Sequence, residues 1–427
     1  MKEIRLKTIM KRVVMFIGVL LALNVLYFAF MTLAFSIPAE GKVKENMGNS
    51  LFTWQKDTAF PIFDDGKSYW YDLQGELLWA NIAVNYTDNP IATTIEMPYT
   101  EVSGQAEGDF CAPLIQALYY PDAENSIHTS YSRYWMLIAG VFRILFLVWE
   151  IKEIRYIFYF TVLALAFLLL YKVNKILGWR GYMPLCVAMA SRIWFMQAIC
   201  ATTLPDILIS LLAMLSLISL HKSEKYVKYQ EMLFFVIGSV SFAFGPLIAP
   251  LTTLGMTLIL NIMLLKQKDN DKIAWVRCVT NSIAWAAGYL GSIACKSILA
   301  KITLENQTAT ESIMYWLGPG QGVKERLGRI VYCIEGLLSP INVKLPIFII
   351  LVVIIILLII KRGFEIFRSK FIVLFVTLYP VFWVFIVVEH SIHYYADNIF
   401  SVFVYGLFTV MVCMVSDKRK NDITEKN

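Results

Sequence analysis

Long apolar runs alternate with short polar segments along this chain. The run from Val13 to Ile37 contains no charged side chain, and it exceeds the roughly 20 residues that an α-helix needs to cross a hydrocarbon layer of about 30 Å. It is too long for the apolar core of a signal peptide, so we expect a retained first membrane helix. The same pattern predicts further spans at 156–171, 182–200, 204–220, 232–247, 249–265, 278–295, 345–360, 371–388 and 398–415. We therefore predict an all-α polytopic membrane protein with about ten transmembrane helices.

Charged residues are scarce and unevenly distributed. They make up 16% of the 427 residues, against about 25% in soluble proteins. Most Lys and Arg lie at the N-terminus, in short loops at 172–180, 222–228, 266–277 and 361–370, and in the tail 416–427. Because basic residues concentrate in cytoplasmic loops, we predict a plasma-membrane protein with both termini in the cytoplasm. Basic residues scattered over short loops also exclude nucleic acid as a partner.

The segment after the first helix is acidic and rich in Tyr and Trp, which predicts a large, mixed, folded loop on the extracytoplasmic side. Within it, the apolar residues of Leu73–Val84 recur at helical spacing. Tyr134–Trp149 is apolar but contains Arg143, and a span here would turn every later basic loop outward. We therefore expect an interfacial amphipathic helix at 134–149, with Arg143 reaching phosphate headgroups.

These predictions divide the chain into consecutive regions. They are the cytoplasmic N-terminus with the first helix (1–37), the extracytoplasmic loop (38–155), transmembrane helices (156–295), a second extracytoplasmic segment (296–344) with an amphipathic stretch at Val323–Leu338, the last transmembrane helices (345–415) and a cytoplasmic tail (416–427). Cys111 and Cys333 fall in the two outer segments. Two unpaired thiols are expected there, with a disulfide as the alternative. The chain has no Cys-x-x-Cys pair that would indicate a zinc ribbon.

Asp72 and Glu76 form the first constellation that could carry chemistry. An i, i+4 spacing on a helix places both carboxylates on one face, about 6 Å apart. Close carboxylates raise the pKa of one of the pair, which suits a general base. Together they could also hold a divalent cation. The alternative is a solvated acidic face on an outer helix.

A short predicted outer loop contains two of the four histidines, His390 and His393. Imidazole can donate to phosphate or to a sugar hydroxyl, transfer a proton or ligate a metal. Glu389 and Asp397 are the nearest further ligands that a metal site would need. The alternative is a pair of interfacial histidines without a special role.

Several basic residues lie in predicted outer or interfacial segments, where the positive-inside tendency should deplete them. They are Arg133, Arg143, Lys296, Lys301, Lys324, Arg326 and Arg329. Such residues suit an anionic lipid phosphate, and ordinary contact with acidic phospholipid explains them equally well. Arg192 lies inside an apolar span, where it needs a partner or a cavity. It could pair with Asp206 or bind a phosphate.

Three short motifs resemble those of the GT-C class of membrane glycosyltransferases. Trp70–Glu76, continuing to Asn81, is similar to an Asp-x-x-x-Asp-x-x-x-x-Asn pattern of bacterial relatives, with Glu76 in place of the second Asp. Ser132–Trp135 resembles the Ser-Arg-Tyr-Trp that opens their surface helix, although Met136 stands where those relatives have His. His390–His393 resembles a His-Ser-x-His element before their last span. The layout of a first helix, a long outer loop and many spans is also similar.

The resemblance implies an inverting transfer of a sugar from a polyprenyl-phosphate donor to an extracytoplasmic acceptor. Asp72, supported by Glu76, would deprotonate the acceptor hydroxyl. Arg133, Arg192, Arg326, Arg329, His390 and His393 are the candidate ligands of substrate and phosphate. The implied partners are the lipid-linked donor and the bilayer, and no nucleotide site is needed. The alternatives are a polytopic transporter or lipid-linked-oligosaccharide flippase, and a polysaccharide polymerase or ligase.

Overall fold

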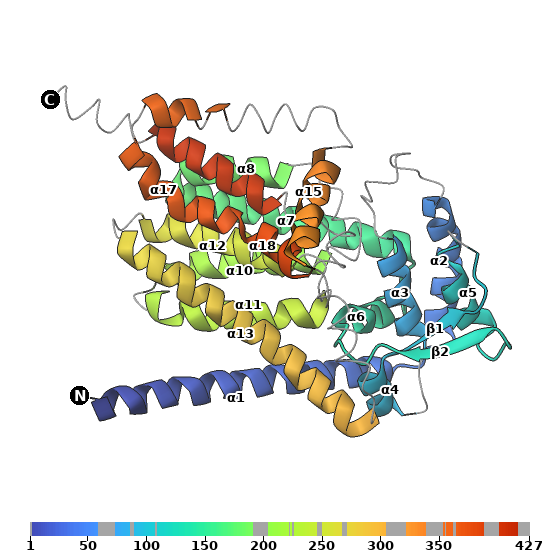
Figure 1. Cartoon of the computed structure of the whole chain (residues 1–427). Helices are drawn as coiled ribbons and strands as arrows, with labels where there is room; N and C mark the ends of the chain where they lie inside the picture. The colour runs from blue at the N-terminus through green and yellow to red at the C-terminus, as the bar shows by residue number, and fades with distance from the viewer. Residues whose placement is uncertain are drawn as a thin grey trace.

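The computed structural model describes residues 2–58, 73–85, 89–106, 109–190, 204–221, 223, 226–245, 250–266, 271–304, 322–338, 353–354, 356–361, 364–387 and 401–416. Over these residues the chain is mainly helical, as the apolar pattern predicts, with one small two-stranded sheet. The helices bundle side by side, and a lobe of shorter elements lies at one end of the bundle (Figure 1).

The bundle contains helices that are long and apolar enough to cross a membrane. Its labelled elements are α1 (Lys2–Phe35), α7 (Ile151–Leu177), α8 (Trp179–Ala190), α10 (Leu204–His221), α11 (Tyr226–Phe244), α12 (Pro250–Lys266), α13 (Asp271–Leu304), α15 (Val323–Leu338), α17 (Phe364–Thr377) and α18 (Tyr379–Ile386). By length and composition, α1, α7, α10 and α13 qualify as spans among the described residues. Shorter apolar helices occupy Pro250–Lys266, Lys370–Ile386 and Ser401–Ser416. The membrane class is thus supported, while the count of about ten spans stays a prediction.

The lobe, which we call the head, consists of the elements between α1 and α7. They are α2 (Lys42–Thr58), α3 (Leu73–Val84), α4 (Pro90–Glu96), β1 (Pro98–Val102), α5 (Ala112–Tyr119), β2 (Ser126–Ser130) and α6 (Leu137–Leu145). The predicted helix at Leu73–Val84 is confirmed as α3, and the predicted stretch at Val323–Leu338 is confirmed as α15. A large folded unit after the first helix is therefore present.

The sheet of the head is attached to α3 by the amide side chains of Asn81 and of Asn85, whose oxygen accepts from the Thr100 hydroxyl at 3.0 Å. β1 and β2 pair antiparallel, from Pro98 opposite Ser130 to Val102 opposite Ser126. The Asn81 amide donates to the carbonyl oxygen of Thr100, and its oxygen accepts from the backbone N–H of Thr100, both at 2.9 Å. Because one buried amide satisfies both backbone groups of Thr100, β1 is held in register against α3.

The expected contact of Arg143 with phosphate headgroups is wrong. The side chain of Arg143 is fully buried in α6, which packs against α1 and α3. Its Nε and Nη2 donate to the carbonyl oxygen of Ile37 at 2.8 and 2.6 Å, and Nη1 donates to that of Ala83 at 2.8 Å. Carbonyls at and beyond helix ends lack partners within the helix, and the forked guanidinium satisfies them here.

A buried polar network joins the head to the bundle. Trp135 donates its indole N–H to Asn24 of α1 at 2.9 Å. The Tyr27 and Ser239 hydroxyls lie 2.9 Å apart, and Ser239 in turn lies 2.7 Å from Ser292. Hydrogen bonds of this kind connect helices where no water competes for them. They bring α1, α11 and α13 together at the head.

The helices α11 and α13 approach so closely that glycine is required at their contact. A Cβ atom on Gly238 would lie 2.0 Å from the carbonyl oxygen of Trp285, and one on Gly288 would lie 2.0 Å from that of Phe235. Small residues allow such close backbone contact between membrane helices. Any side chain at these two positions must therefore push the helices apart.

We predict that Gly288→Ala lowers the stability of the bundle by about 1–3 kcal/mol, because the added methyl group would overlap a backbone oxygen. Thermal unfolding in detergent, followed by tryptophan fluorescence, measures the effect. Gly18→Ala is the matched control, since the Cβ atom there meets no atom within 4 Å. Equal melting temperatures for the two variants would contradict the close contact.

Candidate functional site

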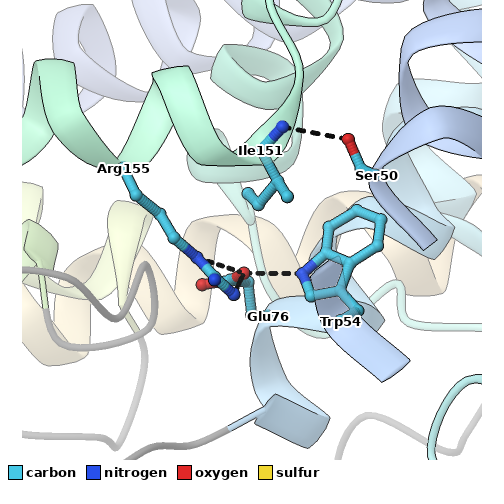
Figure 2. A network of polar contacts seen from close by, with 5 residues as sticks. All are labelled: Ser50, Trp54, Glu76, Ile151 and Arg155. Carbon is cyan, nitrogen blue, oxygen red and sulfur yellow. Dashed lines mark hydrogen bonds and ion pairs between the residues drawn. The ribbon is translucent and has the colours of Figure 1, made fainter. Parts of the chain in front are cut away.

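The predicted carboxylate Glu76 lies at a buried junction between the head and the bundle (Figure 2). The Trp54 indole N–H donates to Oε1 of Glu76 at 2.7 Å. Arg155 donates to the same oxygen from Nη2 at 2.6 Å and from Nε at 3.2 Å. The helices α2, α3 and α7 therefore meet at one carboxylate oxygen.

The neighbouring contact extends this junction. Ser50 of α2 accepts a hydrogen bond from the backbone N–H of Ile151, the first residue of α7, at 2.9 Å. This bond satisfies one of the N–H groups that the first turn of a helix leaves without a partner. The Glu76–Arg155 ion pair and the Ser50–Ile151 hydrogen bond hold the first turns of α7, a candidate span, against the head (Figure 2).

Burial in an ion pair changes the interpretation of Glu76. The alternative of a solvated acidic face is wrong for this residue, because its side chain has no exposed surface. One oxygen of this carboxylate already accepts from both the Arg155 guanidinium and the Trp54 indole N–H. The arrangement suits anchoring of α3 better than proton transfer. Arg155, which sequence reasoning missed, directly precedes the predicted span 156–171, and this boundary position is the signal that could have identified it.

Several predicted site residues lie outside the described residues or have undescribed side chains. Asp72, Arg192, His390 and His393 are outside, so their expected convergence is untested. Arg329 belongs to α15, but its side chain is not described. Cys111 is buried, and the side chain of Cys333 is not described, so their pairing is also untested. Among the described residues, no group of three or more His, Cys, Asp or Glu could hold a metal ion.

Three basic residues predicted to contact phosphate instead bind backbone carbonyl groups. Arg143 does so in the head, as described above. Lys296 of α13 is fully buried and donates to the carbonyl oxygens of Thr94 and Ile95 in α4 at 3.0 and 2.9 Å. Arg326 of α15 donates to that of Phe385 in α18 at 2.8 Å. These contacts give the three cations a structural role.

Arg133 differs from those three cations. Its guanidinium lies over the ring of Tyr131, 3.8 Å from the centroid, and 5.2 Å from that of Tyr134. Its Nε atom is buried without a hydrogen-bond partner among the described residues, whereas the hydroxyl of Tyr134 has the Arg133 guanidinium beside it. Burial raises the pKa of Tyr134, so the hydroxyl stays a donor at neutral pH. Buried donors without partners are rare and need an explanation, and oxygen atoms of a ligand would supply one.

A cavity of about 330 Å³ lies between α3, β1 and α5. The α3 residues that line it are Gln74, Leu77, Leu78 and Asn81. Since successive helical residues turn by about 100°, these four share one face, and Glu76 points away from it by roughly 150°. The helix α3 therefore has one face tied to the membrane helices and another that lines the cavity.

The cavity combines aromatic walls with a polar rim. The rings of Tyr99, Phe110 and Tyr131 line it, and those of Tyr99 and Tyr131 meet edge to face with 5.7 Å between centroids. Tyr99 donates its hydroxyl to Glu101 at 2.6 Å. Burial, with a smaller effect of that hydrogen bond, raises the pKa of Tyr99 to about 12. The hydroxyl is therefore protonated at physiological pH.

A scan against protein-family models, a search of curated proteins and a search of solved structures each give no match.

We predict that Glu76→Gln and Arg155→Met each destabilise the protein by roughly 3–5 kcal/mol, because either change leaves one buried charge without its counter-charge. The double variant Glu76→Gln/Arg155→Met should lose less than the sum of the two losses. Denaturant unfolding in detergent measures all of them.

The matched control for this pair is Glu45→Gln, which removes an exposed ion pair with Lys42 on α2 and should leave stability nearly unchanged. Wild-type stability of Glu76→Gln, together with loss of activity, would instead make Glu76 a catalytic group.

Proposed function

We propose that this chain is a membrane glycosyltransferase that moves a sugar from a polyprenyl-phosphate donor to an acceptor on the extracytoplasmic side. The proposal is supported by two features of the fold. Several apolar helices could hold the protein in the bilayer with its lipid-linked donor. A head is folded directly against the ends of α1 and α7 (Figure 1), which suits a reaction at the membrane boundary.

The ion pair between Glu76 and Arg155 is the observation that carries the proposal. It ties the first turn of α3 to the beginning of a candidate span, and Asp72 directly precedes α3 in the sequence. A carboxylate near that boundary could act on an acceptor while the donor lipid remains in the bilayer. Glu76 is then a positioning residue, and Asp72 is the proposed catalytic base.

In the proposed reaction, the acceptor hydroxyl oxygen attacks the anomeric carbon of the donor sugar. The bond between this carbon and the phosphate oxygen breaks, and polyprenyl phosphate leaves with the bonding electron pair. Asp72 takes the proton of the attacking hydroxyl, and attack opposite to the leaving group inverts the anomeric carbon. No nucleotide takes part in this scheme.

Arg133 is the described residue that best suits the leaving phosphate. Its Nε atom is a buried donor without a partner among the described residues, and the hydroxyl of Tyr134 lies beside the same guanidinium. Donors that are already in place stabilise charge that develops on a leaving oxygen. Arg192, Arg329, His390 and His393 remain candidate ligands for the sugar or the phosphate. Arg326 is a weaker candidate, because it binds the carbonyl oxygen of Phe385.

We predict that Asp72→Asn lowers sugar transfer by a factor of about 10² to 10⁴, the usual contribution of a general base, while the protein still inserts and folds. The assay uses full-length protein in liposomes with a panel of polyprenyl-phosphate-linked hexoses and pentoses. It measures the release of polyprenyl phosphate, so the acceptor need not be known if water can accept the sugar slowly.

Asp122→Asn is the matched control, because Asp122 is an exposed carboxylate of the head that does not line the cavity. Full activity of Asp72→Asn would remove Asp72 from the mechanism. Wild-type protein that moves the lipid-linked sugars across the bilayer without releasing polyprenyl phosphate would be a flippase, and the transferase proposal would fail.

A further inference from the structure

We propose that the cavity between α3, β1 and α5 is a carbohydrate-binding site that holds one neutral pyranose ring of the acceptor. The assignment to the acceptor rests on the proposed transferase function. The binding of a neutral sugar does not rest on that function, because it is inferred from the walls, the rim and the charge of the cavity.

The walls of the cavity match the two kinds of surface that a pyranose presents. One face of the sugar ring carries C–H groups and is apolar, whereas its edge carries hydroxyl groups. The aromatic rings of Tyr99, Phe110 and Tyr131 offer flat apolar surface to such a face. Leu77 and Leu114, which are both buried, add aliphatic surface to the lining. Concave sites of this composition, with a few polar groups that fix orientation, are typical of small-molecule binding.

The rim of the cavity supplies the hydrogen-bonding groups that the sugar edge needs. Gln74, Glu101 and Gln105 line the cavity, and all three side chains are exposed to solvent. The Glu101 carboxylate already accepts from Tyr99, but a carboxylate has about four acceptor positions. Gln74 can both donate and accept. Hydroxyl groups, which do the same, are therefore the natural partners of this rim.

Charge decides which class of sugar fits. Among the described residues, the lining includes the Glu101 carboxylate and no Lys or Arg side chain. A phosphate or a sugar acid would be repelled by Glu101 and would find no counter-charge in the lining. Arg133 contacts Tyr131 but is not among the lining residues. An uncharged ring is thus favoured in the cavity, and the phosphate of the donor is assigned to a separate place near Arg133.

The size and position of the cavity limit what it can hold. Its volume of about 330 Å³ is at the lower end of the roughly 300–1,000 Å³ of ligand pockets, which suits a single ring better than a long glycan. Gln74 on its rim follows Asp72 by two residues in the sequence. A ring held here would leave the rest of an acceptor near the proposed base.

The experiment measures equilibrium binding of four neutral disaccharides, maltose, cellobiose, lactose and N,N′-diacetylchitobiose, to full-length protein in detergent by saturation-transfer NMR. We expect at least one to bind wild-type protein. Phe110→Ala and Glu101→Ala should each weaken that binding by about tenfold, since each removes one wall or one hydrogen-bonding group. Tyr120→Ala is the matched control, because Tyr120 is an exposed aromatic residue that does not line the cavity.

Two results would overturn the assignment. One is that none of the four disaccharides binds, or that binding is equal in all variants. The other is that glucose 6-phosphate or a glucuronic acid displaces the neutral sugar as the preferred ligand, or that a short peptide does. Thermal unfolding of Phe110→Ala and Glu101→Ala, compared with Tyr120→Ala, shows whether a loss of binding is merely a loss of folding.

The same measurements separate this site from the proposed function. Asp122→Asn, which changes an exposed carboxylate outside the cavity, should retain disaccharide binding at wild-type affinity. Binding that is lost in Phe110→Ala, in a protein that releases no polyprenyl phosphate from any donor, supports the site and rejects the transferase. Transfer with an acceptor KM that is unchanged in Phe110→Ala and Glu101→Ala supports the transferase and rejects the site.

Discussion

The buried ion pair between Glu76 and Arg155 connects the two parts of this protein. A charge removed from water is costly unless a counter-charge and hydrogen bonds replace the water. Glu76, fully buried in α3, meets Arg155 at the beginning of α7 and the indole N–H of Trp54 from α2. Each of the three groups needs the others, so the head can take one position on the helix bundle. The cavity itself lies wholly within the head, between α3, β1 and α5.

Other buried cations strengthen the same junction in a different way. Arg143 binds the carbonyl oxygens of Ile37 and Ala83, and Lys296 binds those of Thr94 and Ile95. In each case the cation satisfies carbonyl groups near the ends of helices, where a positive charge is also favoured by the helix dipole. From their position in the sequence, these cations were expected to contact lipid phosphate. They instead attach α3, α4 and α6 to the membrane helices. Arg133, whose Nε atom has no partner among the described residues, is the cation that this structural role does not explain.

The two faces of α3 have different proposed roles: one attaches the head to the bundle, and the other lines the cavity. Glu76 on one face holds the helix to α7, and Gln74, Leu77 and Asn81 on the other line the cavity. Asn81 also fixes β1, which contributes Tyr99 and Glu101 to the same cavity. A helix anchored in this manner can present a preformed binding surface without relying on a mobile loop, and preformed surfaces lose less entropy on binding.

The sequence by itself determined the elements that depend on local pattern. Apolar runs such as Val13–Ile37 and the spacing in Leu73–Val84 predicted helices that the structure contains, because helix formation and membrane burial depend on neighbouring residues. The tertiary structure decided what the charged residues do. Glu76 and Arg155 are 79 positions apart, and Arg143 lies 106 positions from Ile37, so no local pattern could show that they meet. The energy of a buried charge depends on the partners around it in space, and only folding brings those partners together.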